Sequence, residues 1–238
     1  MTNQQTRPLP REAIILAGGL GQRLRALVPD LPKPMAPVGD KPFLARLLDL
    51  IARQGVERVI LSVGYKSDVI MDHFGKRYNG LELVYAVEER ALGTAGGIRL
   101  GLERVHGEQA FVLNGDTWFD APLVRLAARF AQQPAGVVMA VKPMENCSRY
   151  GAIHLDGDRI TGFQEKGLQG PGLINGGVFL LSAALREELT GCFSFESDFL
   201  QPRIHRMTVA AVVCEGFFID IGIPEDYLAA QTLLTRPG

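Results

Sequence analysis

The 238-residue chain has almost no net charge. Its 25 Lys and Arg residues nearly balance 26 Asp and Glu residues, which leaves a formal net charge of −1. Without an overall positive field, the sequence predicts binding neither to nucleic acid nor to an anionic membrane surface. Any polyanionic ligand must therefore be bound by a local cluster of cations.

Cysteines and long apolar runs are also scarce. Cys147, Cys192 and Cys214 are widely spaced, and their odd number favours a reduced cytosolic protein over a disulfide framework or a zinc site. No apolar run approaches the roughly 20 residues of a membrane span. Residues 1–11 are polar and lack the apolar centre of a signal peptide. We therefore expect a cytoplasmic protein without a membrane segment.

The composition is that of a globular protein, with 47% apolar and 21% charged residues. Neither an internal repeat nor a linker stands out. We predict a flexible tail over residues 1–10 and a single domain over residues 11–238.

Apolar runs alternate with segments of helical periodicity, which predicts an α/β fold whose mixed, mostly parallel sheet is covered on both faces. The prolines between 28 and 37 predict an extended connection. A hairpin around Asp156-Gly157 adds antiparallel strands in the second half. Strands are predicted at 13–16, 58–63, 81–87, 110–113, 136–141, 173–181, 208–213 and 217–220, and helices at 43–51 and 67–78 and from about 120 and 224.

A glycine-rich segment follows the first strand and predicts a triphosphate site. Gly18, Gly19 and Gly21 allow backbone N–H groups to approach a bulky anion, and Arg23 and Lys33 supply positive charge. The spacing fits neither a Walker A motif nor the dinucleotide fingerprint. A glycine turn without a ligand and a solvated lysine are the alternatives.

Two aspartates follow predicted strands, where open α/β sheets bind ligands. Asp116 ends Asn114-Gly115-Asp116, and Asp220 precedes the last helix. Mg²⁺ usually takes one or two protein carboxylates together with substrate phosphates, so the pair predicts a magnesium site. Each aspartate alone would be better explained by a turn.

Other polar groups at strand ends leave alternatives open. Glu88-Glu89 and the glycines of 92–97 could line a base pocket, but a helix N-terminus explains them as well. Glu165-Lys166 and Asn175-Gly176-Gly177 could hold sugar hydroxyls and a phosphate, or simply lie on the surface.

Taken together, these motifs resemble those of the sugar-1-phosphate nucleotidylyltransferases. They occur in the family's order over nearly the whole chain, and the phrases at 28–37 and 193–196 are similar to the short heptose 1-phosphate guanylyltransferases. Gln22 replaces the usual Thr, and Gly167 replaces the Pro of many relatives. The resemblance implies a Rossmann-like three-layer nucleotidyltransferase fold.

The resemblance also implies a reaction. GMP is transferred from GTP to D-glycero-D-manno-heptose 1-phosphate, which yields GDP-heptose for bacterial surface polysaccharides and pyrophosphate. The implied partners are GTP, a sugar 1-phosphate and a second copy of the chain in a homodimer. Alternatives are a transferase that uses UTP, CTP or dTTP, such as an N-acetylmuramate 1-phosphate uridylyltransferase, a metal-dependent glycosyltransferase, and a non-catalytic nucleotide-sensing subunit.

The resemblance assigns roles to residues at each part of the site. The implied catalytic residues are Arg23, Lys33 and Asp116. Mg²⁺ would be held by Asp116 and Asp220. The nucleotide would be bound by Leu16, Ala17, Gly18, Gly19, Gly21, Arg23, Glu88, Gly93 and Thr94. The sugar phosphate would be bound by Tyr150, Gly151, Glu165, Lys166, Asn175 and Gly177.

Overall fold

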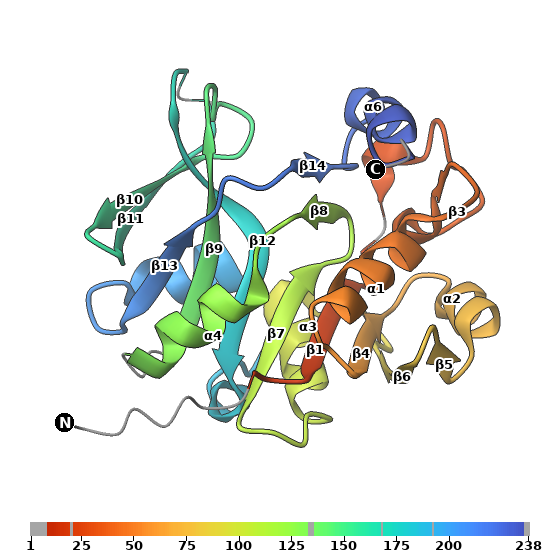
Figure 1. Cartoon of the computed structure of the whole chain (residues 1–238), viewed down its shortest axis with the longest axis horizontal. Helices are drawn as coiled ribbons and strands as arrows, with labels where there is room; N and C mark the ends of the chain where they lie inside the picture. Colours follow the sequence, from red (N-terminus) through yellow and green to blue (C-terminus); the bar gives the residue numbers. More distant parts are fainter. Residues whose placement is uncertain (1–8, 20, 133–135, 168, 192, 236–238) are drawn as a thin grey trace.

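A ten-stranded mixed β-sheet runs through the centre of the molecule (Figure 1). The computed structural model describes residues 9–19, 21–132, 136–167, 169–191 and 193–235. The sheet order is β10-β11-β13-β9-β12-β7-β1-β4-β6-β5. Its strands are β1 Glu12–Ala17, β4 Arg58–Val63, β5 Arg77–Tyr78, β6 Leu81–Val87, β7 Gln109–Asn114, β9 Val137–Met144, β10 Ala152–Asp156, β11 Arg159–Gln164, β12 Gly172–Ser182 and β13 Val209–Val213.

Most strands run in one direction, as the sequence predicts. The strands β6, β4, β1 and β7 are consecutive parallel neighbours, which is the arrangement of a Rossmann-like half. β12 is antiparallel to both β7 and β9, and β13 is parallel to β9. Consequently β9 and β13 also end at the edge where β1, β4, β6 and β7 end, whereas β12 begins there.

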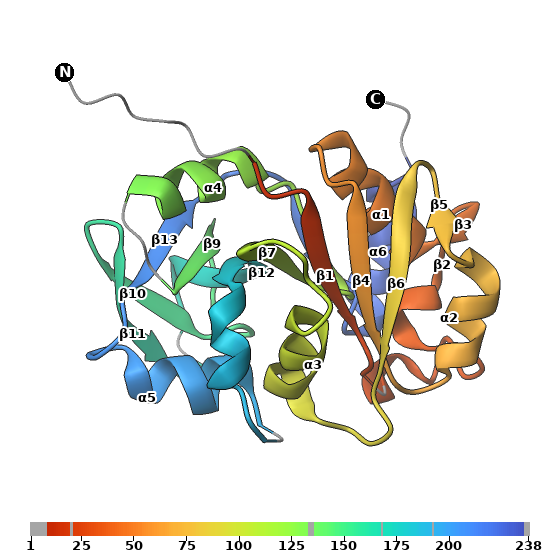
Figure 2. The ribbon, with the colours of Figure 1, turned by 90° about the horizontal axis from the view of Figure 1, so that it is seen from below.

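Helices cover both faces of the sheet and make three layers (Figure 2). One face carries α1 Phe43–Arg53, α2 Ser67–Phe74 and α4 Leu123–Gln132, and the other carries α3 Gly93–Leu102, the 3₁₀ helix Ala183–Glu187, a π-helix Phe195–Leu200 and α5 Gln201–Arg203. β1 shows why: Ala13 and Ile15 pack into the first layer, and Ile14 between them packs into the second. This alternation follows from side chains on successive strand residues pointing to opposite faces.

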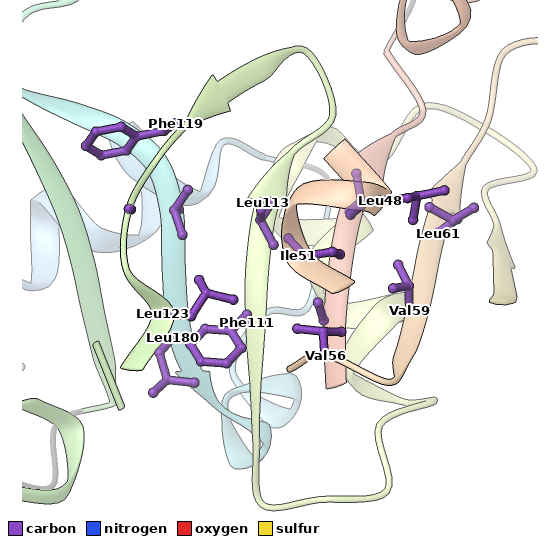
Figure 3. Packing of buried hydrophobic residues seen from close by; sticks show 14 of the residues in the cluster. Leu48, Ile51, Val56, Val59, Leu61, Phe111, Leu113, Phe119, Leu123 and Leu180 are labelled. Atoms are coloured by element: carbon purple, nitrogen blue, oxygen red, sulfur yellow. The ribbon is translucent and has the colours of Figure 1, made fainter. Parts of the chain in front are cut away.

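The larger core lies between the sheet and α1 (Figure 3). Leu48 and Ile51 of α1 face Val59 of β4 and Phe111 of β7, and all four side chains are completely buried. Fully burying a side chain of this kind contributes about 1.5–3 kcal/mol. Apolar packing therefore fixes the strands whose ends carry the polar motifs.

A third apolar cluster packs together the segments that lie next to the carboxyl ends of the parallel strands. It joins the 3₁₀ turn Gln22–Leu24, α1, β14 Phe218–Asp220 and α6 Pro224–Leu233. β14 pairs with β8 Thr117–Phe119, and the hydroxyl of Tyr227 donates to the carbonyl of Pro37 at 2.7 Å. The last helix thus anchors the segment after the glycine loop.

Three local predictions from the sequence are wrong. The helix expected at 67–78 ends at Phe74, and residues 77–78 form β5. The hairpin turn consists of Gly157 and Asp158, because Asp156 pairs with Arg159. The proline-rich connection contains a 3₁₀ turn at Lys33–Met35 and a small hairpin of β2 Pro37–Val38 and β3 Lys41–Pro42.

Residues 1–8 of the expected tail lie outside the described residues. Within the described ranges, every helix is too short or too polar to cross a bilayer.

Candidate active site

The two aspartates predicted as metal ligands lie side by side, although they are far apart in sequence. Asp116 follows β7, and Asp220 ends β14, which pairs with β8 directly after Asp116. The backbone N–H of Ile221 donates to the carbonyl of Asp116 at 2.9 Å. The pairing of two short strands therefore brings both carboxylates to the carboxyl end of the sheet.

Lys33 lies between these carboxylates. Its Nζ is 2.5 Å from Oδ2 of Asp116 and 3.7 Å from Oδ1 of Asp220. The side chain of Lys33 is 10% exposed, compared with 36% for Asp116 and 25% for Asp220. Burial and the nearby negative charge of Asp116 raise the pKa of Asp220, while the charges of Lys33 and Arg23 and the N–H of Gly222 lower it. The site thus holds two close acids that a cation stabilises.

The backbone around Lys33 explains why its ammonium group reaches this position. Lys33 begins a 3₁₀ turn after the extended Pro32, and Pro34 follows it. Gly21 has φ of +57°, and a Cβ there would lie 2.8 Å from Cβ of Lys33. Glycine at 21 therefore permits a turn and also a close approach to the lysine.

A cavity of about 530 Å³ adjoins this cluster on the side of the glycine loop. It is lined by Leu16, Gly18, Gly19, Glu88, Ala91, Gly93, Thr94, Asn114, Gly115 and Asp116. Six of the nine residues expected at the nucleotide site are thereby brought together, namely Leu16, Gly18, Gly19, Glu88, Gly93 and Thr94, and the predicted metal ligand Asp116 joins them. A carboxylate, glycines and a strand end meet here as the sequence predicts.

Glu88 lies beneath the glycine loop. A Cβ on Gly18 would lie 2.6 Å from Oε1 of Glu88, so the glycine at 18 also makes room for this carboxylate. Oε1 accepts from the hydroxyl of Ser62 at 3.3 Å, and Oε2 accepts from the N–H of Leu92 at 3.2 Å. Ser62 is fully buried inside an apolar strand and was missed by the sequence analysis. Glu88 therefore ties the segment before α3 to the glycine loop.

The remaining expected nucleotide residues are placed differently. The side chain of Ala17 is 1% exposed and belongs to the apolar core, so its backbone alone reaches the strand end. Arg23 is exposed on its 3₁₀ turn, close enough for its charge to lower the pKa of Asp220. Leu20 and the side chain of Gln22 lie outside the described part of the chain.

A second cavity of about 660 Å³ lies on the other side of the aspartates. It is lined by Asn114, Thr117, Tyr150, Phe163, Gln164, Glu165, Lys166, Asn175, Gly177, Ser194, Glu196, Ser197, Gln201, Phe218 and Asp220. Five of the six residues expected at a sugar phosphate are included. The sixth, Gly151, has φ of +76°, and a Cβ there would lie 2.5 Å from the carbonyl oxygen of Gln164, so it shapes the turn beside the cavity.

An irregularity in β12 shapes the wall that the two cavities share. Its pairing with β9 shifts register between Asn175 and Phe179, and such bulges often re-aim side chains near sites. Gly177 has φ of +71°, and a Cβ there would lie 2.7 Å from Nδ2 of Asn114. Asn114 lines both cavities, so the two spaces meet beside Asp116.

Residues 194–201, which include no predicted site residue, form one wall of the second cavity. Nδ2 of Asn175 donates to Glu196, and Oδ1 of Asn175 accepts from the N–H of Gly177 at 2.8 Å. The hydroxyl oxygen of Thr94 accepts from the N–H of Phe195 at 2.8 Å, which joins this segment to the first cavity. The sequence signal was the phrase at 193–196, but its spacing alone gave no reason to place Glu196 beside Asn175.

The chemistry of these side chains suits a hard cation bound jointly with a ligand. In the described ranges, no group of three or more His, Cys, Asp and Glu residues is placed to hold a metal ion. The protein offers two carboxylates, and Mg²⁺ commonly takes one or two of these while phosphates and water complete its shell. The aspartate pair fits such an ion.

Comparison with known proteins gives a consistent result. The family model described as nucleotidyl transferase matches residues 12–236. The D-glycero-alpha-D-manno-heptose 1-phosphate guanylyltransferases of Aneurinibacillus thermoaerophilus and Campylobacter jejuni are each 42% identical, over 92% and 91% of this chain and 96% of each relative. The crystal structure of HddC from Yersinia pseudotuberculosis complexed with GMP-PN superposes with a TM-score of 0.84 at 36% identity, covering 95% of this chain and 100% of that chain.

Proposed function

The chain belongs to the nucleotidyl transferase family, and we propose that it transfers GMP from GTP to D-glycero-D-manno-heptose 1-phosphate. The products are GDP-heptose and pyrophosphate. The observation that carries this proposal is the meeting of two cavities at Asn114, beside Asp116, Asp220 and Lys33. One cavity accepts a nucleoside triphosphate and the other a sugar phosphate. The choice of guanine and heptose is supported by the relatives described above.

The reaction is an in-line displacement at the α-phosphorus of GTP. A phosphate oxygen of the sugar 1-phosphate forms a bond to the α-phosphorus, and the bond between this phosphorus and the oxygen bridging to the β-phosphorus breaks. The electron pair leaves with pyrophosphate. Such chemistry depends on positioning and on neutralising charge, so it needs no covalent protein intermediate.

The cavity at the glycine loop would bind GTP. Arg23 and the N–H groups of the loop would hold the β- and γ-phosphates and stabilise the leaving pyrophosphate. Lys33 would neutralise charge at the α-phosphate. Glu88, through its hydrogen bond to the N–H of Leu92, would fix the segment that carries Gly93 and Thr94 against the base and ribose.

The second cavity would bind the sugar phosphate. The rings of Tyr150 and Phe218 make a T-shaped contact with centroids 5.6 Å apart, and the guanidinium of Arg149 lies over the tyrosine ring. This fixed ring would form one wall, and the polar side chains that meet the sugar would be Glu165, Lys166, Asn175 and the backbone of Gly177.

Asp116 and Asp220 would hold Mg²⁺ together with the bound phosphates. When bound, the ion would screen the phosphate charges and polarise the α-phosphate. Asp116 and Asp220 supply the negative charge that it needs, and burial, followed by repulsion from Asp116, raises the pKa of Asp220. Without a bound ion, Lys33 is the positive charge beside Asp116.

Several expectations about the whole protein stay predictions. They are a single domain over residues 11–238, a cytoplasmic location, a homodimer, and a product used for bacterial surface polysaccharides. Light scattering of the purified protein would test the homodimer directly.

Pyrophosphate release tests the proposed function. The enzyme is supplied with Mg²⁺, heptose 1-phosphate and either GTP, ATP, UTP, CTP or dTTP, and GTP is expected to give the highest kcat/KM. Asp116→Asn should lower kcat by at least about 10²-fold without unfolding the protein. Asp156→Asn removes a carboxylate from the exposed end of a hairpin strand and is the matched control. Turnover with UTP but not GTP would overturn the assignment of guanine.

A further inference from the structure

The cavity assigned to the sugar phosphate has more polar groups than its predicted residues account for. Ser194, Glu196, Ser197 and Gln201 also line it, and all come from the π-helix Phe195–Leu200 and the residues flanking it. π-helical turns are rare and frequently occur at functional sites. One short segment therefore supplies an additional hydrogen-bonding surface to this cavity.

Glu196 is the principal group of this surface. One carboxylate oxygen, Oε2, accepts from Nδ2 of Asn175, and within the described residues the other oxygen, Oε1, has no hydrogen-bond donor. Burial raises the pKa of Glu196, although the hydrogen bond from Asn175 and the charge of Lys166 lower it. Glu196 is half-buried and lines the cavity, so Oε1 is an acceptor that a hydroxyl group of a bound ligand can use in place of water.

Glu196 is connected through Asn175 to the wall where the two cavities meet. Gly177 lies against Asn114, where the two cavities meet. Asn175 precedes Gly177 by two residues, which is at most about 7 Å along a strand, and Glu196 is hydrogen-bonded to the side chain of Asn175. A sugar whose phosphate lies near Asp220 would therefore extend toward the π-helix.

The neighbouring side chains are suited to the same ligand. Ser197 and Gln201 are four residues apart and both line the cavity, so a hydroxyl and an amide accompany the carboxylate. A carboxylate accepts hydrogen bonds from two hydroxyl groups at once, and an amide both donates and accepts. The hydroxyl of Ser197 donates to Oδ1 of Asp198 at 3.1 Å, which leaves its oxygen as an acceptor. This combination matches a vicinal diol.

We propose that Glu196, together with Ser197 and Gln201, binds the exocyclic C6–C7 diol of the heptose and so distinguishes a heptose 1-phosphate from a hexose 1-phosphate. The inference rests on the proposed function and adds a specificity-determining subsite to it. A hexose of the same configuration has a single exocyclic hydroxyl, so its binding leaves an acceptor of Glu196 unsatisfied. Sites that hydrogen-bond a hydroxyl discriminate strongly against ligands that lack it.

The test is a cycle of two enzymes and two sugars. Wild-type protein and Glu196→Gln are assayed with saturating GTP and either heptose 1-phosphate or mannose 1-phosphate, with an inhibition constant measured for any sugar that is not turned over. Glu196→Gln should weaken heptose 1-phosphate about tenfold or more, mainly in KM, and mannose 1-phosphate less than threefold. Glu188→Gln, which changes the same charge at an exposed position outside the cavity, should affect neither sugar.

Equal losses with both sugars would overturn the proposal, because Glu196 would then act on the shared ring or by positioning Asn175. If Glu196→Gln does not fold, Ser197→Ala is assayed in the same cycle with the same expected selectivity. In a ligand-side measurement, 7-deoxyheptose 1-phosphate should bind wild-type protein about as weakly as mannose 1-phosphate, and binding equal to that of heptose 1-phosphate would also overturn the proposal. Failure of wild-type protein to use heptose 1-phosphate would instead refute the proposed function.

Discussion

Replacing Gly21 by alanine tests how the glycine loop controls Lys33. The added Cβ would lie 2.8 Å from Cβ of Lys33, a contact too short to persist, and the backbone at Gly21 has φ of +57°. Either the loop or the lysine must move. Because Nζ of Lys33 is 2.5 Å from Asp116, a displaced lysine would leave both the aspartate and the bound phosphate.

Two magnitudes can be separated. The left-handed backbone costs an alanine about 1–2 kcal/mol, which for a protein of this size lowers Tm by roughly 2–8 °C. Displacement of a catalytic cation by about 1 Å costs about 10²-fold in rate. We therefore expect Gly21→Ala to lose far more activity than its modest loss of stability would explain.

Gly157→Ala is the matched control for the backbone cost. Gly157 has φ of +59° in a hairpin turn, and no atom lies within 4 Å of the position of its added Cβ. Thermal denaturation should show a decrease in Tm for Gly21→Ala at least as large as that for Gly157→Ala, while pyrophosphate release should fall only for Gly21→Ala. If Gly21→Ala kept wild-type kcat with the same decrease in Tm, contact with Gly21 would not be what positions Lys33.

Two further predictions concern stability. Burial raises the pKa of Glu196 in the folded protein above its usual 4.5. Between pH 4.5 and the raised pKa, the folded protein therefore binds more protons at this residue than the unfolded chain does. The stability that Glu196 contributes is thus present at low pH and is lost as the pH rises through this range. The Tm of Glu196→Gln relative to wild-type protein should therefore increase from pH 4.5 to pH 7, and a constant difference would contradict the assigned pKa shift. Gly101→Ala in α3 adds a Cβ 2.6 Å from Ile14, and overpacking of about 1–3 kcal/mol should outweigh the gain of about 1 kcal/mol in helix propensity. A Tm above that of wild-type protein would show that Ile14 can move aside.

The strands and most helices could be predicted from local pattern. The run 58–63 and the alternation at 81–87 match β4 and β6 residue for residue. Apolar patterning is sufficient here because β4 is buried along nearly its whole length, which gives a continuous apolar run, whereas β6 mixes buried and exposed positions, which gives alternation. Weaker signals failed at boundaries: the periodicity at 67–78 continued past Phe74, where the chain turns at Gly75.

The candidate site could be predicted as a set of motifs but not as an arrangement. The sequence predicted Lys33, Asp116 and Asp220 as charged groups of one phosphate site, and their ammonium and carboxylate groups are in contact or close to it. Spacing gave no reason for Ser62 to hold Glu88 or for Asn175 to bind Glu196. These contacts join residues on different strands and helices, so no local pattern encodes them.

The sequence by itself determined the fold class, the family motifs and the types of chemical group at the carboxyl end of the sheet, because propensity, periodicity and glycine-loop chemistry are local properties. Tertiary structure decided which groups meet. The pairing of β8 with β14 brought Asp220 beside Asp116, and the bulge in β12 set Asn175 beside the π-helix. Such contacts depend on strand register and on packing between layers. Only the folded chain therefore placed a second cavity next to that of the glycine loop, with Glu196 in its wall.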